Sequence, residues 1–224
     1  HEPYANARSY DDVGRPTISV SRMRSLVMNA ASHGYAVRIH TIGDRAVSEA
    51  INIFTEALMK YGAPKVGTHT LEHVEDIVPE DIDRLAKTGI VASVQPPHIT
   101  IDTSQPKRDL GENRAQRMWP LSEMLDAGVC LALGTDSPIV SPSSNDVLYT
   151  AITRKNPDTH LPKNGWYPNH NISMAEALSS YTKGSARAAG CENEVGTIEV
   201  GKFADLVVWD TNLLDTETEN IQKA

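Results

Sequence analysis

Two histidines and an aspartate, each at or just after the end of a short apolar run, could together bind a metal ion: His40, His73 and Asp136. Imidazole nitrogens and a carboxylate around an open coordination position are how proteins build a catalytic zinc site. A metal ion held in this way lowers the pKa of bound water and polarises a substrate carbonyl. The three residues lie too far apart in sequence for a local motif, so the fold must bring them together. Two histidines and an aspartate suit zinc, iron or manganese.

Asp136 has more than one role open to it. It follows Val129–Leu133, an apolar run without alternation that predicts a buried strand, and it precedes Ser137-Pro138. An aspartate in that place can be a metal ligand, a general base or the cap of the next turn, because Asp before Ser-Pro is common turn chemistry. Two other strand ends that finish in histidine favour the first two roles.

The other histidines divide by position. His69 precedes His73 by four residues, about a dozen ångströms back along an extended chain at ~3.3 Å per residue, so we interpret it as structural. His98 stands beside two prolines at a strand end and is a candidate substrate contact, with Arg45 as a second. No role is predicted for the histidines at a helix end, in loops or at the start of the chain: His1, His33, His160 and His170.

Strands and helices that alternate along the chain would position these residues. The sequence predicts four strands, at Tyr35–Ile39, Val66–Leu71, Ile90–Val94 and Val129–Leu133. Helices are expected after Ser19, Asp44, Pro79, Pro120, Ser143 and Ser173, each of which suits a helix start. This alternation implies an α/β fold with a parallel sheet and right-handed crossovers, whose strands end at one shared edge. Four units are too few for a (β/α)₈ barrel of ~250 residues, so the chain forms a small open sheet or half a barrel.

The sequence also predicts the structure of three further segments. The polar stretch from Ile99 to Met118 is expected to be a loop, and loops of that length are usually functional lids or mobile segments. Ala204–Asp210 predicts a strand. Residues 211–224 are polar and expected to fray.

Composition excludes several classes of protein. The 224 residues carry a formal net charge of −8, which argues against a general nucleic-acid binder. No apolar run approaches the roughly 18–20 residues that span a bilayer, and no secretory segment is visible, so we expect a cytoplasmic protein that does not enter a membrane. Two cysteines, Cys130 and Cys191, make a disulfide framework unexpected.

Four stretches together resemble the metal-dependent amidohydrolase superfamily, in the branch of N-substituted formamide deformylases and D-aminoacylase-like enzymes. They are His40-Thr41-Ile42-Gly43-Asp44-Arg45-Ala46, Leu71-Glu72-His73, Gly134-Thr135-Asp136-Ser137-Pro138, and the tail from Gly196 to Val208. The resemblance implies strands five to eight of a (β/α)₈ barrel over residues 1–195. It also implies that residues 196–224 are a β-strand tail belonging to a small accessory β-sandwich.

The same resemblance implies a function for each candidate residue. His40 and His73 would be metal ligands from strands five and six, and Asp136 would contact the metal and accept the proton of the attacking water. The implied activity is hydrolysis of a carbon–nitrogen bond other than a peptide bond, in a small amide- or formamide-type substrate. Zinc is the expected ion.

The sequence also departs from the family pattern. Family members carry a His-x-His pair on strand one and a carboxylated lysine or another ligand on strand four, and this chain has no His-x-His. We therefore expect the C-terminal portion of a longer hydrolase, with reduced or absent metal binding and little activity of its own.

Two other functions stay open. A non-catalytic half-barrel would leave the outer edges of the strands ending at His40 and Leu133 unpaired, and would self-associate or pair with a missing N-terminal half. An open sheet could instead bind a small ligand where its strand order reverses, although Gly43-Asp44-Arg45 matches no nucleotide-binding fingerprint.

Overall fold

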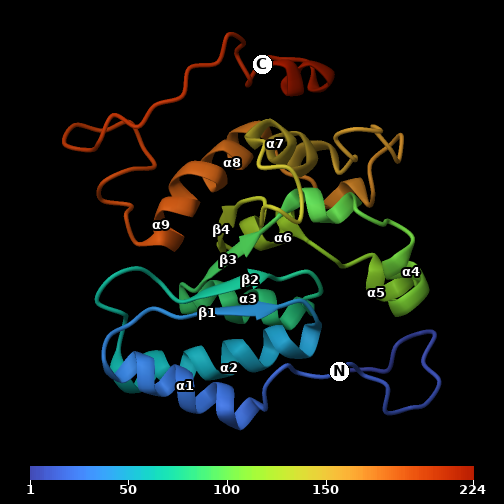
Figure 1. Ribbon diagram of the computed structural model, residues 1–224, viewed down its shortest axis with the longest axis vertical. Helices are drawn as coiled ribbons and strands as arrows, with labels where there is room; N and C mark the ends of the chain where they lie inside the picture. Colours follow the sequence, from blue (N-terminus) through green and yellow to red (C-terminus); the bar gives the residue numbers. More distant parts are fainter.

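The computed structural model describes residues 1–224 and contains one sheet of four parallel strands in the order β1-β2-β3-β4. The strands are β1 (Arg38–Thr41), β2 (Thr70–His73), β3 (Val91–Val94) and β4 (Cys130–Leu133) (Figure 1). Thr41 pairs with His73, and Val94 pairs with Leu133, so the carboxyl ends of the strands lie side by side. The predicted α/β fold with a parallel sheet is confirmed.

Three helices begin where the sequence predicts and have the expected serine caps. Ser19 accepts a hydrogen bond from Arg22 N, Ser143 accepts one from Asp146 N, and Ser173 forms a capping box with Glu176. The helices are α1 (Val20–Ser32), α2 (Asp44–Tyr61), α3 (Pro79–Thr88), α6 (Leu121–Asp126), α7 (Ser144–Thr153), α8 (Met174–Ser179) and α9 (Ser185–Ala189), and a wide π-type turn (Ser180–Gly184) joins the last two. Asp44 was expected as a cap, but Gly43 has that position and Asp44 is the first helical residue. None of these helices is long and apolar enough to cross a membrane.

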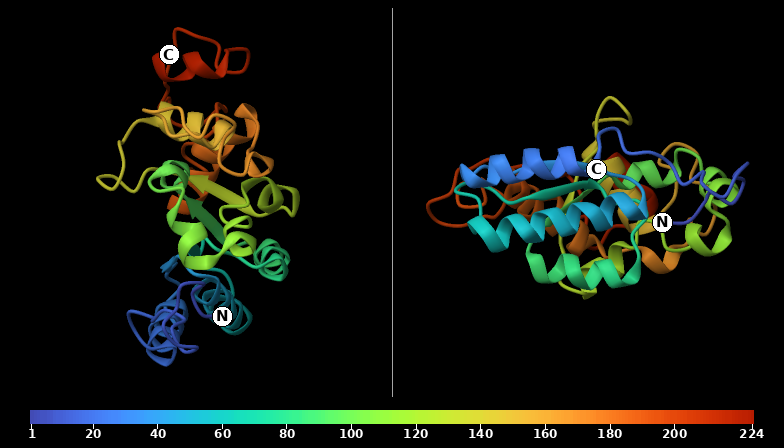
Figure 2. Two further views of the ribbon diagram at one scale, coloured as in Figure 1. Left: turned by 90° about the vertical axis from the view of Figure 1, so that its right-hand side faces the viewer. Right: turned by 90° about the horizontal axis from the view of Figure 1, so that it is seen from below.

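A core of 33 buried residues joins one face of the sheet to the helices. Leu71, Leu131 and Leu133 from the strands pack with residues of α2 and α3, such as Phe54 and Leu85, all of them almost fully buried. The α1–α2 pair lies beyond β1 at one end of the molecule, and the C-terminal residues lie at the other end (Figure 2). Burial of this face fixes the register of the strands and therefore the positions of the residues at their ends.

Arg154 is the largest fully buried side chain and has no carboxylate partner within hydrogen-bond distance. Its guanidinium donates to three backbone carbonyls, those of Trp166 (2.6 Å), Trp119 (2.9 Å) and Met118 (3.2 Å). Burial lowers its pKa to about 9, so the side chain is still charged at neutral pH. Arg154 therefore ties the end of α7 to the segments before α6 and after residue 160.

The two outer edges of the sheet differ. On β4, Ser185 Oγ donates to the carbonyl of Leu133 (3.0 Å), and Gly184 lies so close that an added Cβ would overlap the carbonyl oxygen of Leu131. At β1, the carbonyls of Val37 and Thr41 accept hydrogen bonds from Thr70 N and Val74 N. The N–H and C=O groups of Arg38 therefore point away from β2. The edge of β4 is thus covered by the α8–α9 segment, whereas the edge of β1 has no strand beside it.

The stretch from Ile99 to Met118 is not the extended loop that the sequence analysis predicted. It contains the end of a 3₁₀ helix (Pro96–Thr100) and two short helices, α4 (Gln105–Leu110) and α5 (Glu112–Ala115). Helices of one or two turns are too short to show an apolar periodicity, which is why the pattern predicted a loop. Arg114 holds α5 in place by donating to the carbonyls of Leu110 and Pro3.

The tail also differs from expectation. Ala204–Asp210, predicted as a strand, forms no strand, because no other strand lies beside it to complete a ladder. Trp209 is half-buried, but the other large apolar side chains of this segment and those just before it are exposed, namely Ile198, Val200, Phe203, Leu206, Val207 and Val208. Residues 211–224 were expected to fray, but Leu213 and Ile221 are buried and a 3₁₀ helix (Thr218–Lys223) packs against α7. Two apolar side chains therefore hold a mostly polar end in place.

Candidate metal centre

Two of the predicted ligands come together at the carboxyl ends of β1 and β2. The rings of His40 and His73 have centroids 4.4 Å apart in an edge-to-face arrangement. His40 lies on the exposed side of β1, and His73 is 8% exposed. The parallel register brings these two imidazoles together, as the sequence analysis expected of this edge.

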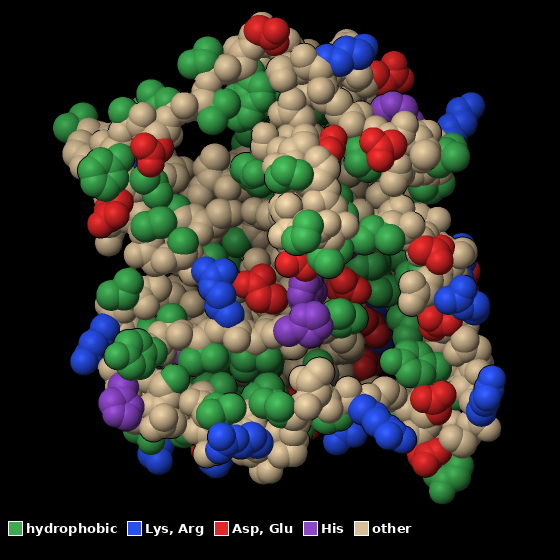
Figure 3. Space-filling view, in the orientation of Figure 1, with side chains coloured by type: hydrophobic (Ala, Val, Ile, Leu, Met, Phe, Trp, Pro, Cys, Tyr) green, Lys and Arg blue, Asp and Glu red, His purple; other side chains and the backbone are tan.

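His98 and Glu75 complete a cluster around His73. His98 lies in the 3₁₀ helix after β3, and its ring centroid is 5.9 Å from that of His73. The Oε1 atom of Glu75 is 3.9 Å from Nδ1 of His98. One ligand atom from each of His73, Glu75 and His98 lies within 4.8 Å of the other two, which is close enough for one metal ion. Figure 3 shows histidine and acidic side chains gathered at the centre of this face.

Hydrogen bonds leave the imidazole nitrogens of this cluster suited to a metal ion. His73 Nδ1 lies 2.9 Å from Oε1 of Gln95, whose amide nitrogen faces the carbonyl of Ser93 at 3.5 Å. With that amide orientation Nδ1 is the donor, so Nε2 of His73 keeps a free lone pair. Nε2 of His98 is buried without a hydrogen-bond partner. Two imidazoles and a carboxylate with these free atoms fit zinc.

The backbone turns sharply directly after His73. His73 has φ 75° and Val74 has φ 47°, a left-handed conformation that is unfavourable for a β-branched residue. Hydrogen bonds from Val74 N to Thr41 O (2.9 Å) and from Asp76 N to Ile42 O (3.0 Å) hold the turn against the end of β1. The turn brings Glu75 back beside the ligand atoms of His73 and His98.

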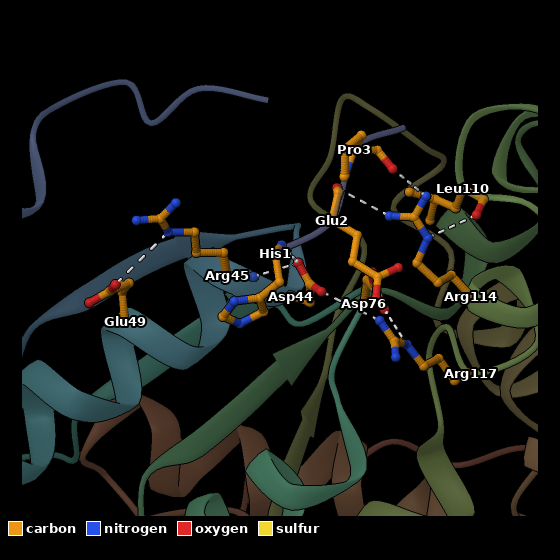
Figure 4. Close-up of polar contacts among 10 residues, drawn as sticks. All are labelled: His1, Glu2, Pro3, Asp44, Arg45, Glu49, Asp76, Leu110, Arg114 and Arg117. Atoms are coloured by element: carbon orange, nitrogen blue, oxygen red, sulfur yellow. Dashed lines mark hydrogen bonds and ion pairs between the residues drawn. The ribbon is translucent and has the colours of Figure 1, made fainter. Parts of the chain in front are cut away.

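A second polar group lies on the same rim, between the turns that leave β1 and β2. Arg117 contacts Asp76 Oδ1 through Nε (3.0 Å) and Asp44 Oδ2 through Nη2 (3.4 Å) (Figure 4). The amino group of His1 also contacts Asp44 Oδ1 (2.7 Å). Burial raises the pKa of Asp76, and the hydrogen bond and charge of Arg117 oppose that effect.

Asp136 is exposed in the turn after β4 and is not among the atoms that converge near His73. It has φ 56°, and its carbonyl accepts a hydrogen bond from Ile139 N (2.9 Å), a turn contact. Arg45, the other candidate substrate contact, is exposed on α2 beside Glu49 and lies apart from the Asp76–Arg117 contact (Figure 4). These two predicted residues therefore lie outside the cluster.

His69 has the structural position that the sequence analysis expected. It is 1% exposed and stacks on Phe54, with the ring centroids 4.5 Å apart and the planes 6° from parallel. Its Nδ1 accepts a hydrogen bond from Val37 N (3.1 Å), and burial lowers its pKa. This environment keeps the imidazole neutral and inside the core.

Sequence reasoning missed Glu75 and Gln95. Glu75 stands two residues after His73 and Gln95 directly follows the third strand, so both lie at strand ends where site residues gather. That position was the available signal. What the sequence does not reveal is the left-handed turn at His73 and Val74, which sets the direction of Glu75.

His40 and His73, at the carboxyl ends of parallel strands, are two of the three ligands that the resemblance implied, whereas the carboxylate near His73 is Glu75 and not Asp136. The family model for amidohydrolases matches residues 1–224. The chain belongs to the amidohydrolase family. Relatives are similar to it over two thirds to nearly all of its length, and each of them is much longer.

This amidohydrolase chain is similar to two relatives and one solved structure in particular. It is 28% identical to N-substituted formamide deformylase of Arthrobacter pascens over 94% of this chain and 38% of that protein. It is also 28% identical to the protein LONG AFTER FAR-RED 3 of Arabidopsis thaliana, over 94% of this chain and 36% of that protein. An uncharacterized metal-dependent hydrolase from Pyrococcus horikoshii OT3 superposes with a TM-score of 0.81 at 25% identity, over 97% of this chain and 42% of that one. The chain thus spans about two fifths of the length of the proteins it matches.

Proposed function

We propose that this chain supplies part of the metal centre of a hydrolase that cleaves a carbon–nitrogen bond other than a peptide bond. The observation that carries the proposal is the cluster of His73, Glu75 and His98, in which Gln95 leaves Nε2 of His73 free. When bound, a divalent ion supplies Lewis acidity towards a substrate carbonyl and a water molecule. Zinc fits the donor set best, and iron and manganese share the same ligand types.

The residues of this chain would have different roles in the metal centre. His73 and His98 would hold the ion through ring nitrogens and Glu75 through a carboxylate oxygen, with His40 beside His73 as a further ligand. His98 becomes a ligand rather than the substrate contact that we expected from the sequence. Asp136 stays the proposed proton acceptor and ligand on the strength of the family resemblance, and Arg45 stays a proposed substrate contact.

The proposed substrate is a small amide or formamide. The similarity to a protein named N-substituted formamide deformylase, over 94% of this chain, supports that class. The formal net charge of −8 makes nucleic acid an unfavourable substrate. A cytoplasmic location remains our expectation from the sequence.

We further propose that the four strands are strands five to eight of a (β/α)₈ barrel, that the barrel part ends near residue 195, and that residues 196–224 belong to an accessory sandwich. The coverage of about two fifths of each relative supports this arrangement. Ligands from the strands of the other half would then be needed for turnover. The chain alone would bind zinc weakly and hydrolyse N-substituted formamides slowly or not at all.

The test measures bound zinc and formamide hydrolysis on the same purified chain. We expect up to one zinc per chain after equilibrium dialysis, loss of that zinc in His73→Ala and retention in His33→Ala, because His33 is exposed at the end of α1. A chain that retains no zinc would contradict the metal centre. Rapid hydrolysis by this chain alone would contradict the need for another half.

A second candidate function is a non-catalytic module that pairs through a sheet edge. The unpaired edge of β1 favours it, whereas the covered edge of β4 limits pairing to that one side. A second copy or a separate N-terminal half would then add a strand beside Arg38 and His40. Light scattering during dilution tests this candidate: it predicts a dimer that dissociates, and a monomer at every concentration would contradict self-association.

A further inference from the structure

Arg117 connects the two turns that carry the proposed metal ligands. Its guanidinium lies between Asp44, the first residue of α2, and Asp76, the third residue after His73 (Figure 4). Asp44 follows β1, which carries His40, and Asp76 follows Glu75. Both carboxylates are mostly buried, with side chains 12% and 6% exposed. One planar cation therefore joins two acidic side chains from neighbouring strand ends.

The turn at Asp76 needs such an anchor. His73 and Val74 both have positive φ values, and residues held in this region persist only where their surroundings fix them. Backbone contacts supply part of the restraint, through Val74 N to Thr41 O and Trp119 N to Glu75 O (2.8 Å). The backbone bond from Asp76 N to Ile42 O adds to it, and the side chain of Asp76 contributes a further restraint through its hydrogen bond from Arg117.

The segment that carries Arg117 is itself fixed to this turn. Asp76 and Met118 form an antiparallel bridge, so residues 117–119 run beside residues 75–76. Arg117 is 30% exposed at its side chain, and its two acidic partners are less exposed than it is. A guanidinium suits this position because it donates to two carboxylates in one plane, whereas an ammonium is a single point charge.

We propose that Arg117 is a positioning residue for the metal centre, which holds the left-handed turn after His73 and so places His73 and Glu75 towards the ion. This inference rests on the proposed function, because it concerns the same ligands. Without Arg117 the carboxylates of Asp44 and Asp76, of like charge, would face each other across the turns, with only the amino group of His1 in contact with Asp44. The turn would then relax, and the contact between His73 Nδ1 and Gln95 would loosen.

Arg114 offers a matched control on the same segment. Its guanidinium donates to the carbonyls of Leu110, Glu2 and Pro3 and not to either carboxylate (Figure 4). Its charge nevertheless acts on Asp76, since it helps to lower the pKa of that carboxyl. Loss of Arg114 therefore alters the electric field at the site but leaves the Asp44–Arg117–Asp76 contacts in place.

The experiment compares Arg117→Gln, Arg117→Lys and Arg114→Gln with the unmodified chain in two measurements. The first is the tautomer of His73 in the metal-free protein, read from long-range ¹H–¹⁵N NMR signals of the imidazoles. The second is the affinity for Co²⁺, read from its visible absorption. Thermal unfolding followed by circular dichroism establishes that each variant folds, and Arg117→Lys keeps the positive charge if Arg117→Gln does not fold.

We expect the unmodified chain and Arg114→Gln to show His73 with its proton on Nδ1, and both Arg117 variants to show a mixture of tautomers. We expect Co²⁺ affinity to fall about tenfold or more in Arg117→Gln and less than twofold in Arg114→Gln. A folded Arg117 variant with the unmodified tautomer would overturn the inference. An unmodified chain that binds no Co²⁺ would contradict the proposed function, while the NMR signals would still decide the role of Arg117.

Discussion

The Nδ1 atom of His73 lies 2.9 Å from Oε1 of Gln95, and this contact joins the ends of β2 and β3. Gln95 is 5% exposed, so water does not compete freely for His73. The contact determines which imidazole nitrogen is available to a metal ion. A proton on Nδ1 leaves the lone pair of Nε2 free to bind the metal. The buried amide of Gln95 therefore determines which nitrogen of His73 can bind a metal ion.

Replacement of Gln95 should weaken metal binding without unfolding the chain. Gln95→Ala removes the acceptor for Nδ1, and loss of such an outer partner lowers metal affinity by about 10- to 100-fold. Competition with a coloured zinc chelator measures the change. Gln105→Ala, at an exposed position on α4, is the control and should bind zinc like the unmodified chain. Equal affinity in both variants would show that the Gln95 contact does not matter for binding.

Gly184 should not tolerate a side chain. An added Cβ would overlap the carbonyl oxygen of Leu131, which is backbone and cannot move aside easily. We expect Gly184→Ala to lower the free energy of unfolding by about 1–3 kcal/mol, the usual effect of overpacking. Gly134→Ala, which would meet no atom within 4 Å, is the control in urea unfolding. If both variants were equally stable, the α8–α9 segment would not pack on the edge of β4 as described.

Arg154 should be important for stability. Arg154→Met keeps much of the side-chain volume but removes a donor from three buried carbonyls, of which that of Trp119 also accepts from Leu121 N (2.9 Å). We expect this loss to cost about 2–4 kcal/mol of unfolding free energy. Arg22→Met changes an exposed arginine on α1 and should have little effect. Urea unfolding measures both. A loss below about 1 kcal/mol in Arg154→Met would contradict the importance of these three hydrogen bonds for stability.

Burial of His69 should make the free energy of unfolding smaller at acidic pH. The native pKa of His69 lies below its ordinary value of 6.5, so the unfolded chain binds more protons between these two values. The free energy of unfolding should therefore fall as pH drops below about 6.5. His69→Phe removes the titrating group and keeps an aromatic ring against Phe54, so it should lose less stability between pH 7 and pH 5.

Urea unfolding at both pH values tests the role of His69. His33→Ala is the control, because it removes a histidine that is exposed at the end of α1. Identical pH dependence in His69→Phe and the unmodified chain would show that His69 is not a source of acid sensitivity.

The sequence was sufficient for the parallel sheet and for the closeness of the His40 and His73 rings at its edge. Apolar runs bounded by glycine and proline located the four strands, and the parallel arrangement then required their ends to share an edge. The residues of that edge could be predicted because strand order and register follow from burial of one face. Local capping signals at Ser19, Ser143 and Ser173 were equally reliable, since they depend on neighbouring residues only.

The parts that failed depend on contacts between distant segments or on unusual backbone. Glu75 enters the cluster because His73 and Val74 adopt positive φ, which is rare for a β-branched residue such as Val74. The strand expected at Ala204–Asp210 needs a neighbouring strand that its own sequence does not supply. Burial of Ile221 against α7 could not be foreseen from a polar C-terminal end.

The most direct test of the metal centre is anomalous diffraction at the zinc edge from crystals of this chain soaked in zinc. We expect one strong peak within about 2.0–2.2 Å of Nε2 of His73, with a nitrogen of His98 and a carboxylate oxygen of Glu75 as further ligands. The peak should disappear in His73→Ala crystals treated in the same way. A peak elsewhere, or none near His73 at saturating zinc, would contradict the claim that these residues hold a metal ion.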